Sequence, residues 1–145
     1  MNIAIGSDHG GYDLKCALKE YLESKGIAVL DVGVDKKLSA DYPDYAKRVG
    51  LLINHKRADF GILICRTGLG MCIAGNKVKG ILAAVCYDEN FAVLARSHNN
   101  ANVLCLGADY TDKKKAEKIV DTFLNTEFQG GRHFRRVRKV KKMEV

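Results

Sequence analysis

The sequence has no apolar run near the roughly 18 residues that a membrane span requires, and it has no secretion signal. Its first residues pass directly into the strand-like segment Asn2–Ile5, without a basic stretch and an apolar stretch before it. Proline occurs once and no segment is of low complexity, so no linker divides the chain. We therefore expect a cytoplasmic protein with a single domain over residues 1–145.

Paired cysteines are also missing. The five cysteines are odd in number, scattered, and never spaced Cys-x-x-Cys. This pattern excludes a disulfide framework and a zinc site of the usual spacing, and it favours a reducing cytoplasm. We expect no bound metal. Four of these residues are expected to fill the core, since they lack a reactive setting: Cys16, Cys72, Cys86 and Cys105.

Acidic residues are absent from one stretch near the C-terminus. The net charge is +7, and seven cations account for all of it, while the rest of the chain holds 17 basic and 17 acidic residues. These cations are Arg132, Arg135, Arg136, Arg138, Lys139, Lys141 and Lys142. The basic character is local, so it marks either a site or a solvated tail.

What the chain does contain is a regular alternation of short apolar runs and helical periodicity. The apolar runs predict five strands, namely Asn2–Ile5, Ala28–Val32, Phe60–Ile64, Leu82–Cys86 and Val103–Leu106. Strands that alternate with helices form a parallel sheet that is covered on both faces. We expect a three-layer α/β/α sandwich with a five-stranded parallel sheet.

A basic helical segment is expected from about residue 131, after Gly130 and Gly131. It carries a narrow apolar stripe formed by Phe134, Val137 and Val140. So small a stripe on a terminal helix predicts docking on another surface, such as a partner subunit. Arg132 and Arg136 lie four residues apart and share one helix face, which suits a two-pronged grip on a phosphate.

The segment Ser7-Asp8-His9-Gly10-Gly11 lies where the first strand ends and the first helix begins. Ser7 or Asp8 can be an ordinary N-cap there. His9 favours a second interpretation, because a hydrogen-bond donor beside a helix N-terminus is well placed when an anion binds between the donor and the helix. A phosphate would satisfy both groups.

A thiol, a hydroxyl and two glycines follow the buried run Phe60–Ile64, in the order Cys65-Arg66-Thr67-Gly68-Leu69-Gly70. Two glycines let several backbone N–H groups converge on one point, which suits an oxyanion or a phosphate. A cysteine is usually structural, but the start of a helix favours the thiolate form of Cys65. This thiol can be a nucleophile or a proton-transfer base.

A third polar cluster, Ser97-His98-Asn99-Asn100, follows a helix and precedes the last strand. The asparagines can simply form a turn. His98 is placed before a parallel strand, and therefore at the opposite edge of the sheet from Cys65. If both residues serve one site, either the short strand and its loop bring them together or a neighbouring subunit does.

Six motifs in order carry a resemblance to a known family: Ser7–Gly11, Asp41–Ala46, Gly61–Gly70, Ala74–Lys77, Ala95–Asn102 and Gly130–His133. Together they resemble the ribose-5-phosphate isomerase B family, which also includes the galactose-6-phosphate isomerase subunits. The match spans nearly the whole chain. Met71 stands where some relatives have a catalytic carboxylate, so the chain resembles the cysteine-dependent branch.

The resemblance implies a flavodoxin-like or Rossmann-like fold and a homodimer with shared active sites, which can pair further into a tetramer. It implies interconversion of ribose 5-phosphate and ribulose 5-phosphate through an enediolate, in the pentose phosphate pathway, without cofactor or metal. The alternative substrate is a six-carbon sugar phosphate, allose or galactose 6-phosphate.

The resemblance also implies roles for individual residues. Cys65 would be the base, and Thr67 with the backbone of residues 66–70, including Arg66, Gly68, Leu69 and Gly70, would hold the oxyanion. His98 would open the sugar ring. The remaining expected substrate contacts are Asp8, Tyr42 and Asn99 toward the sugar, and His9, Arg132 and Arg136 toward the phosphate.

Three residues depart from the family pattern. Arg66 replaces a small residue, usually glycine, while Asp109 and Leu82 each replace a common arginine. Asp109 places a negative charge near the expected phosphate, and Arg66 adds a positive one. We expect Arg66 to compensate for Asp109.

Two other functions compete with this one. Gly68-Leu69-Gly70 after a strand imitates a dinucleotide-binding fingerprint, but Ile73 occupies the place of the third glycine. The basic segment could track nucleic-acid phosphates, but Phe134 is its one aromatic residue and no recognised motif accompanies it. We therefore expect neither a nucleic-acid partner nor a membrane partner.

Overall fold

Five parallel strands form one sheet in the order β2-β1-β3-β5-β4. The computed structural model describes all residues from 1 to 145. The strands are β1 (Asn2–Ser7), β2 (Ala28–Asp31), β3 (Phe60–Cys65), β4 (Ala83–Val85) and β5 (Val103–Gly107). The sequence predicted all five, and β4 is shorter than expected. Leu82 lies outside β4 because its N–H binds the side chain of Asn102 at 2.8 Å.

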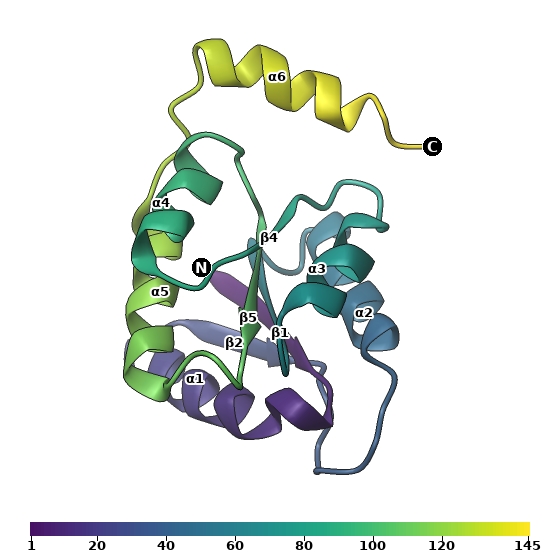
Figure 1. Ribbon diagram of the computed structural model, residues 1–145, viewed down its shortest axis with the longest axis vertical. Helices are drawn as coiled ribbons and strands as arrows, with labels where there is room; N and C mark the ends of the chain where they lie inside the picture. Colours follow the sequence, from purple (N-terminus) through teal and green to yellow (C-terminus); the bar gives the residue numbers. More distant parts are fainter.

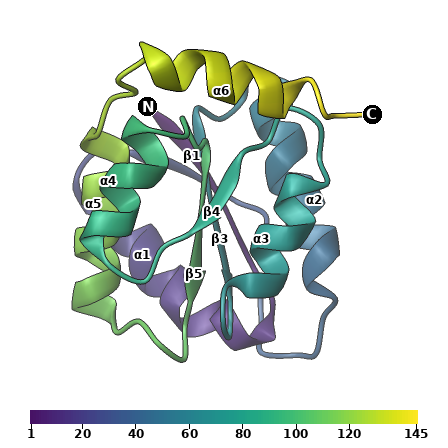
Figure 2. The same ribbon diagram turned by 45° about the horizontal axis from the view of Figure 1, so that its top comes forward.

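Helices cover both faces of the sheet, as the alternation of elements predicted (Figure 1). One face carries α1 (Tyr12–Ser24), α4 (Glu89–Ser97) and α5 (Lys113–Asn125), and the other carries α2 (Tyr42–Asn54) and α3 (Leu69–Asn76). Figure 2 shows the two helix layers on either side of the strands. The three-layer α/β/α architecture is thereby confirmed.

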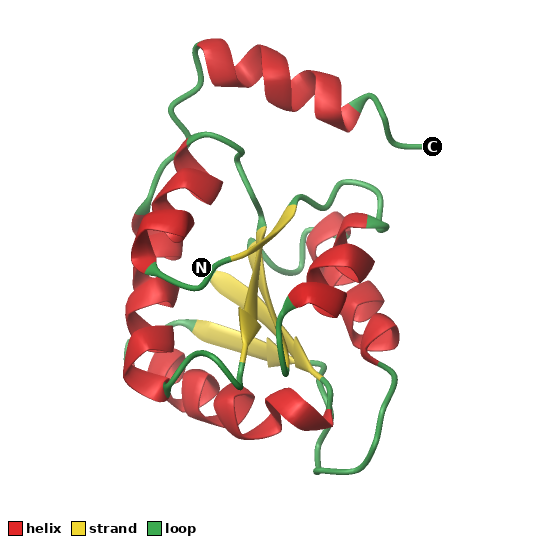
Figure 3. Ribbon diagram, in the orientation of Figure 1, coloured by secondary structure: helices red, strands yellow, loops and turns green.

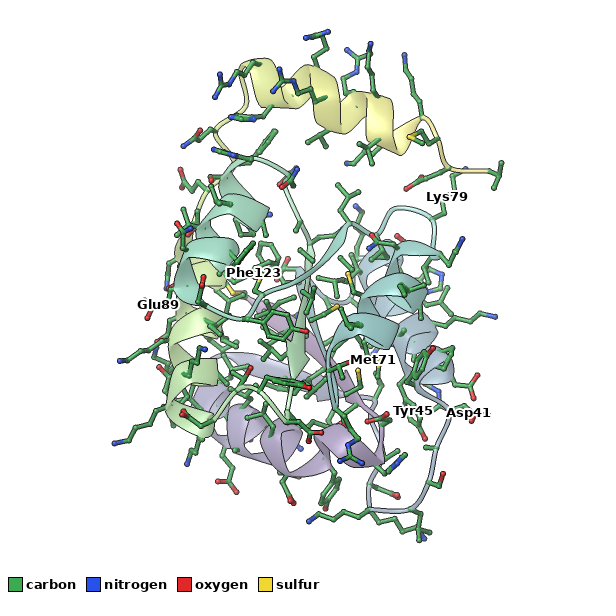
Figure 4. The ribbon with its side chains drawn as sticks, viewed as in Figure 1. Asp41, Tyr45, Met71, Lys79, Glu89 and Phe123 are labelled. Atoms are coloured by element: carbon green, nitrogen blue, oxygen red, sulfur yellow. The ribbon has the colours of Figure 1, made fainter.

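The core divides into two layers because alternate residues of each strand point to opposite faces. Ile62 and Ile64 of β3 face the layer of α1, α4 and α5, whereas Leu63 and Cys65 face α2 and α3. Phe123 of α5 and Met71 of α3 are fully buried on opposite sides of the sheet (Figure 4). Burial of each such side chain contributes about 1.5–3 kcal/mol.

The helix ends follow from local sequence. Asp88 and Asp112 cap α4 and α5, because their carboxylates accept hydrogen bonds from the N–H groups of Phe91 (2.8 Å) and Lys115 (2.9 Å). Gly26 lies just past α1 with φ +79°, a left-handed conformation that a side chain would disfavour. These caps fix where the connecting loops begin.

The final helix α6 (Arg132–Lys141) crosses the end of the sheet away from the strand arrowheads (Figure 3). It follows Gly130 and Gly131, which both have positive φ, and its far end is held by Glu144, whose carboxylate accepts from Gly80 N–H at 2.9 Å. Of its apolar stripe only Val137 is buried, while about half of Phe134 and of Val140 is exposed. The docking of this stripe on a partner subunit remains a prediction.

Candidate active site

The first group of polar side chains lies at the C-terminal ends of β1 and β3. These two strands are neighbours at the point where the strand order reverses, which is where open α/β sheets bind ligands. Asp8 follows β1 directly, and its N–H binds the carbonyl of Ile64 at 3.3 Å. The segments that contain Asp8 and Cys65 are therefore held side by side.

Asp8 fulfils the capping role that the sequence left open. Its Oδ1 accepts hydrogen bonds from Gly10 N–H (3.0 Å) and Gly11 N–H (3.2 Å) at the start of η1 (His9–Gly11). Its Oδ2 makes no hydrogen bond within the chain, although the residue is buried. One carboxylate oxygen fixes the turn, and the other is free to accept from a ligand.

His9 is exposed and its ring is oriented by the loop before α2. Nδ1 accepts a hydrogen bond from Ala40 N–H at 3.3 Å. A neutral imidazole that accepts at Nδ1 carries its hydrogen on Nε2. His9 therefore offers an N–H donor in the turn that follows Asp8.

Cys65 ends β3 on the side of α2 and α3. Its thiol accepts a hydrogen bond from Gly68 N–H at 3.1 Å, and only 4% of the residue is exposed. Gly68 has φ +84°, the left-handed conformation that turns its N–H back toward the sulfur. The thiol is thus sheltered but bonded to the loop that opens α3.

The loop after Cys65, residues 66–70, is held in place by hydrogen bonds of Thr67 and by its close contact with Gly107 at the end of β5. Thr67 Oγ1 accepts from Leu69 N–H at 3.2 Å, and the Thr67 carbonyl accepts from the Tyr87 hydroxyl at 2.7 Å. A Cβ atom on Gly107 would overlap the Thr67 carbonyl oxygen. The first N–H groups of α3 have no partner inside the helix, so this loop can bind an anion.

Tyr42 lies over the start of α3. A Cβ atom on Gly70 would come within 2.8 Å of the Tyr42 ring, so the ring packs against this glycine. Tyr42 is the first residue of α2 and is 38% exposed. The structure therefore brings Tyr42, Cys65 and the loop together at one edge, as the sequence predicted.

Arg66 and Asp109 form an ion pair beside this group. Arg66 Nε lies 3.0 Å from Asp109 Oδ2, and the hydrogen bond between them raises the pKa of the guanidinium. Two backbone bonds run alongside, from Ala108 N–H to the Cys65 carbonyl at 2.9 Å and from Asp109 N–H to the Arg66 carbonyl at 3.0 Å. The two departures from the family pattern are thus direct partners.

The second group of expected site residues lines a cavity of about 570 Å³ beneath α6. His98, Asn99, Arg132 and Arg136 surround it together with Leu82. The His98 ring stacks on His133 at a centroid distance of 4.1 Å, and burial of His133 lowers its pKa. Arg132 and Arg136 share this inner face of α6, as their spacing predicted.

The two groups lie at opposite ends of the sheet. In the pairing of β3 with β5, Gly61 opposes Val103 at one end and Cys65 opposes Gly107 at the other. Four residue steps separate Val103 from Gly107, roughly 13 Å of strand. The loop that carries His98 precedes Val103, so one chain does not bring His98 to Cys65. If both residues serve one site, the fold of a single chain does not bring them together, and the contribution of a neighbouring subunit stays a prediction.

Comparisons with known proteins identify the family. The model of the ribose/galactose isomerase family matches residues 3–140. This chain belongs to that family. Ribose-5-phosphate isomerase B of Escherichia coli is 42% identical over 142 residues, which cover 98% of this chain and 95% of the relative. The family assignment made from the sequence motifs is confirmed.

Solved structures of the family share the whole fold. Ribose-5-phosphate isomerase B from Thermotoga maritima has 54% identity and a TM-score of 0.96, with 97% of each chain covered. The enzyme from Mycoplasma genitalium, with bound ribulose-5-phosphate, has 46% identity and a TM-score of 0.92, and 98% of this chain and 95% of that chain are covered. The Rossmann-like fold expected from the resemblance is therefore confirmed.

Of the four cysteines expected to fill the core, two are fully buried and two are not. Cys86 and Cys105 are fully buried, and burial raises the pKa of Cys86 to about 12. Cys16 and Cys72 are only half buried; Cys72 packs against the edge of the core, whereas Cys16 is not part of either core cluster. A hydrogen bond with Cys105 lowers the pKa of the Cys72 thiol to about 7. Periodicity placed Cys72 on a helix but gave no measure of its depth.

His133, which lines the cavity beneath α6, was not predicted from the sequence as a site residue. It lies in the Gly130–His133 motif, but sequence reasoning gave roles only to the arginines of α6. Its position four residues before buried Val137 was the available signal, because residues at that spacing share a face.

None of the helices has both the length and the apolar character of a bilayer span. No three His, Cys, Asp or Glu side chains are grouped so that they could hold a metal ion.

Proposed function

We propose that this protein interconverts ribose 5-phosphate and ribulose 5-phosphate. One observation carries the proposal: a thiol that accepts from Gly68 N–H lies at the C-terminal end of β3, in a segment whose backbone is bonded to the turn that carries Asp8. The family supplies the substrate, because the Mycoplasma genitalium relative binds ribulose-5-phosphate. We propose one isomerase domain over residues 1–145, acting in the pentose phosphate pathway.

Cys65 is the proposed base. As a thiolate it takes the proton from C2 of the open-chain aldose and returns it to C1, with an enediolate between the two steps. The negative charge that develops on the sugar oxygen is held by Thr67 and by the loop N–H groups of Gly68, Leu69 and Gly70. To do so, the N–H groups of Gly68 and Leu69 exchange Cys65 Sγ and Thr67 Oγ1 for the sugar oxygen. No electron leaves the substrate, so the reaction needs no redox cofactor.

The site is completed by a second copy of the chain. We propose a homodimer in which His98 and Asn99 of the partner subunit reach the sugar of the first copy and open its ring. His9 binds the phosphate together with Arg132 and Arg136 of the partner subunit, and Asp8 and Tyr42 contact the sugar. The cavity under α6 and the exposed residues Phe134 and Val140 support this arrangement.

Free thiols support a cytoplasmic setting for this enzyme. None of the five cysteines is paired, and Cys65 must stay reduced to act as a base. An oxidising compartment would threaten this thiol. We propose the cytoplasm on this ground.

The test is a set of sugar phosphates assayed with the wild type and Cys65→Ala. We expect ketose formation from ribose 5-phosphate, and we expect Cys65→Ala to lower kcat about 10²–10⁴-fold, the usual contribution of a positioned base. The exchange of the substrate's C2 hydrogen for deuterium from deuterium oxide, measured by NMR, should also be lost in Cys65→Ala. Cys16→Ala, at a half-buried position on α1, is the matched control and should keep full activity.

The other sugars decide between substrates. Preferential turnover of allose or galactose 6-phosphate would replace the five-carbon substrate by a six-carbon one. Full activity of Cys65→Ala would remove the thiol from the mechanism. Absence of turnover with every sugar would overturn the proposed function.

A further inference from the structure

The Arg66–Asp109 pair spans the mouth of the Cys65 site. Arg66 follows the thiol directly, after β3, and Asp109 follows β5, the next strand in the sheet. A Cβ atom on Gly10 would overlap Arg66 Cγ, so the stem of Arg66 lies on the turn that carries Asp8 and His9. The side chain thus crosses from the end of β1 to the loop after β5.

Asp109 engages only one edge of the guanidinium. Its Oδ2 accepts from Nε at 3.0 Å, and this is the one hydrogen bond that the Arg66 side chain makes. The two terminal nitrogens have no partner within the chain. In addition, 70% of the Arg66 side chain is exposed, so these nitrogens can reach a ligand.

A guanidinium with a free pair of donors suits a phosphate, because its planar fork matches two anionic oxygens at once. The pair itself adds little to folding stability, since exposed ion pairs contribute about 0–1 kcal/mol. Stability therefore does not explain why an acid holds this arginine in place next to the thiol. A role in orienting the Arg66 guanidinium explains this arrangement.

We propose that Asp109 is a positioning residue that aims Arg66 at the phosphate of the sugar substrate. This inference rests on the proposed function for the identity of the substrate, and it assigns the phosphate contact to the terminal nitrogens of Arg66. Asp109 fixes Nε and turns those nitrogens toward the side of His9. The negative charge of Asp109 would otherwise only repel the ligand.

The direction in which Asp109→Asn changes phosphate binding distinguishes a positioning role of Asp109 from simple electrostatic repulsion. Asp109→Asn removes a negative charge, so plain electrostatics predicts tighter binding of a phosphate. Loss of the ion pair frees Arg66 to adopt many rotamers, so positioning predicts weaker binding. We expect KM for ribose 5-phosphate to rise about threefold with kcat unchanged, as for a contact equally strong in ground and transition states.

Arg66 itself is tested in parallel. Arg66→Gln should raise KM about tenfold, the size of one lost charge-assisted contact. Arg66→Lys keeps the charge without the fork and should recover only part of this loss. In the Arg66→Gln background, Asp109→Asn should no longer raise KM, because its effect acts through Arg66.

Titration with inorganic phosphate by calorimetry gives a readout that needs no isomerase activity. Wild type should bind phosphate more tightly than Asp109→Asn or Arg66→Gln. Asp121→Asn removes the acid of another exposed ion pair, with Lys25, and is the control that should leave both KM and phosphate binding unchanged. Thermal unfolding of each variant establishes that it folds.

Two outcomes would overturn the inference. One is a KM or phosphate affinity that improves in Asp109→Asn. The other is an equal effect of Asp109→Asn with and without Arg66. Failure of the proposed function is distinct, because it would abolish turnover in the wild type while the phosphate titrations still test the pair.

Discussion

At the scale of single residues, the donors of the site are occupied before any substrate arrives. Gly68 N–H points to the Cys65 thiol, Leu69 N–H to Thr67 Oγ1, and two N–H groups to Asp8 Oδ1. Such bonds hold the turns in one conformation, so less ordering is needed when a ligand binds.

Cys72 differs from its buried neighbours in reactivity. Its pKa of about 7 leaves much of the thiol ionised at neutral pH, whereas burial raises the pKa of Cys86 to about 12. We expect iodoacetamide to alkylate Cys72 in the native protein with a midpoint near pH 7, and to spare Cys86 and Cys105. Peptide mapping by mass spectrometry measures each site.

Cys105→Ala supplies the control for this reactivity. It removes the hydrogen bond that contributes most to the lowered pKa, so the alkylation midpoint of Cys72 should move to higher pH. An unchanged midpoint would exclude Cys105 as the cause. Cys72→Ser identifies the labelled peptide.

At the scale of elements, the start of α3 depends on close contact with the end of β5. A Cβ atom on Gly107 would overlap the Thr67 carbonyl oxygen, which is backbone and cannot rotate away. We expect Gly107→Ala to lower the free energy of unfolding by about 1–3 kcal/mol, as overpacking does. It should also lower kcat, because it displaces the loop that we propose to hold the oxyanion.

Gly26→Ala is the comparison for Gly107→Ala. Nothing lies within 4 Å of a Cβ atom there, and only the φ of +79° opposes the change. It should cost about 1 kcal/mol and leave kcat unchanged. Urea unfolding and steady-state kinetics on the same samples separate the two effects; equal kcat in both variants would contradict the prediction.

We expect the packing of α6 against the rest of the molecule to be sensitive to acid through His133. Burial, and next the neighbouring His98 ring, lower the pKa of His133 below its usual 6.5. Between these two values the unfolded chain binds more protons than the folded one, so stability falls as pH falls below about 6.5. We expect faster hydrogen exchange in α6 at pH 5.5 than at pH 7.5, after correction for intrinsic rates.

His133→Phe keeps an aromatic ring against His98 without a titrating group. In this variant the extra exchange of α6 at low pH should vanish. His55→Gln changes an exposed histidine after α2 and should leave the pH dependence intact. A pH response that survives in His133→Phe would assign it to another group.

At the scale of the whole molecule, the expected site residues divide between the two ends of one sheet. Cys65 and Asp8 lie at the end where β1 and β3 finish, and His98 with the two arginines of α6 lies at the other. In the proposed dimer, each chain therefore contributes one half to each of two sites. Two copies related by a twofold axis would complete two equal sites.

Mixed dimers test this arrangement. Cys65→Ala and His98→Ala should each be inactive alone, because each removes a group from every site. Refolded together from equal amounts, they should regain about a quarter of the wild-type activity, since half of the dimers are mixed and each mixed dimer has one intact site. No recovery would show that both residues act within one chain.

Much of this organisation could be predicted from the sequence. The alternation of apolar runs and helices predicted the sheet, and the order of elements placed Cys65 and His98 at opposite edges, because parallel strands all end on the same side. The half burial of Cys72, the stacking of His98 on His133 and the cavity under α6 could not be predicted. They depend on depth and on tertiary contacts, which periodicity does not report.

The position of α6 across the far end of the sheet has a consequence for how the enzyme behaves in dilute solution. A lone copy holds the Cys65 thiol at one end of the sheet and Arg132 and Arg136 at the other, so in the proposed dimer a separated chain should not turn over a sugar. Specific activity should then decline on dilution in step with the fraction of chains that remain associated. The specific activity of such a protein depends on the association of its chains as well as on its catalytic residues.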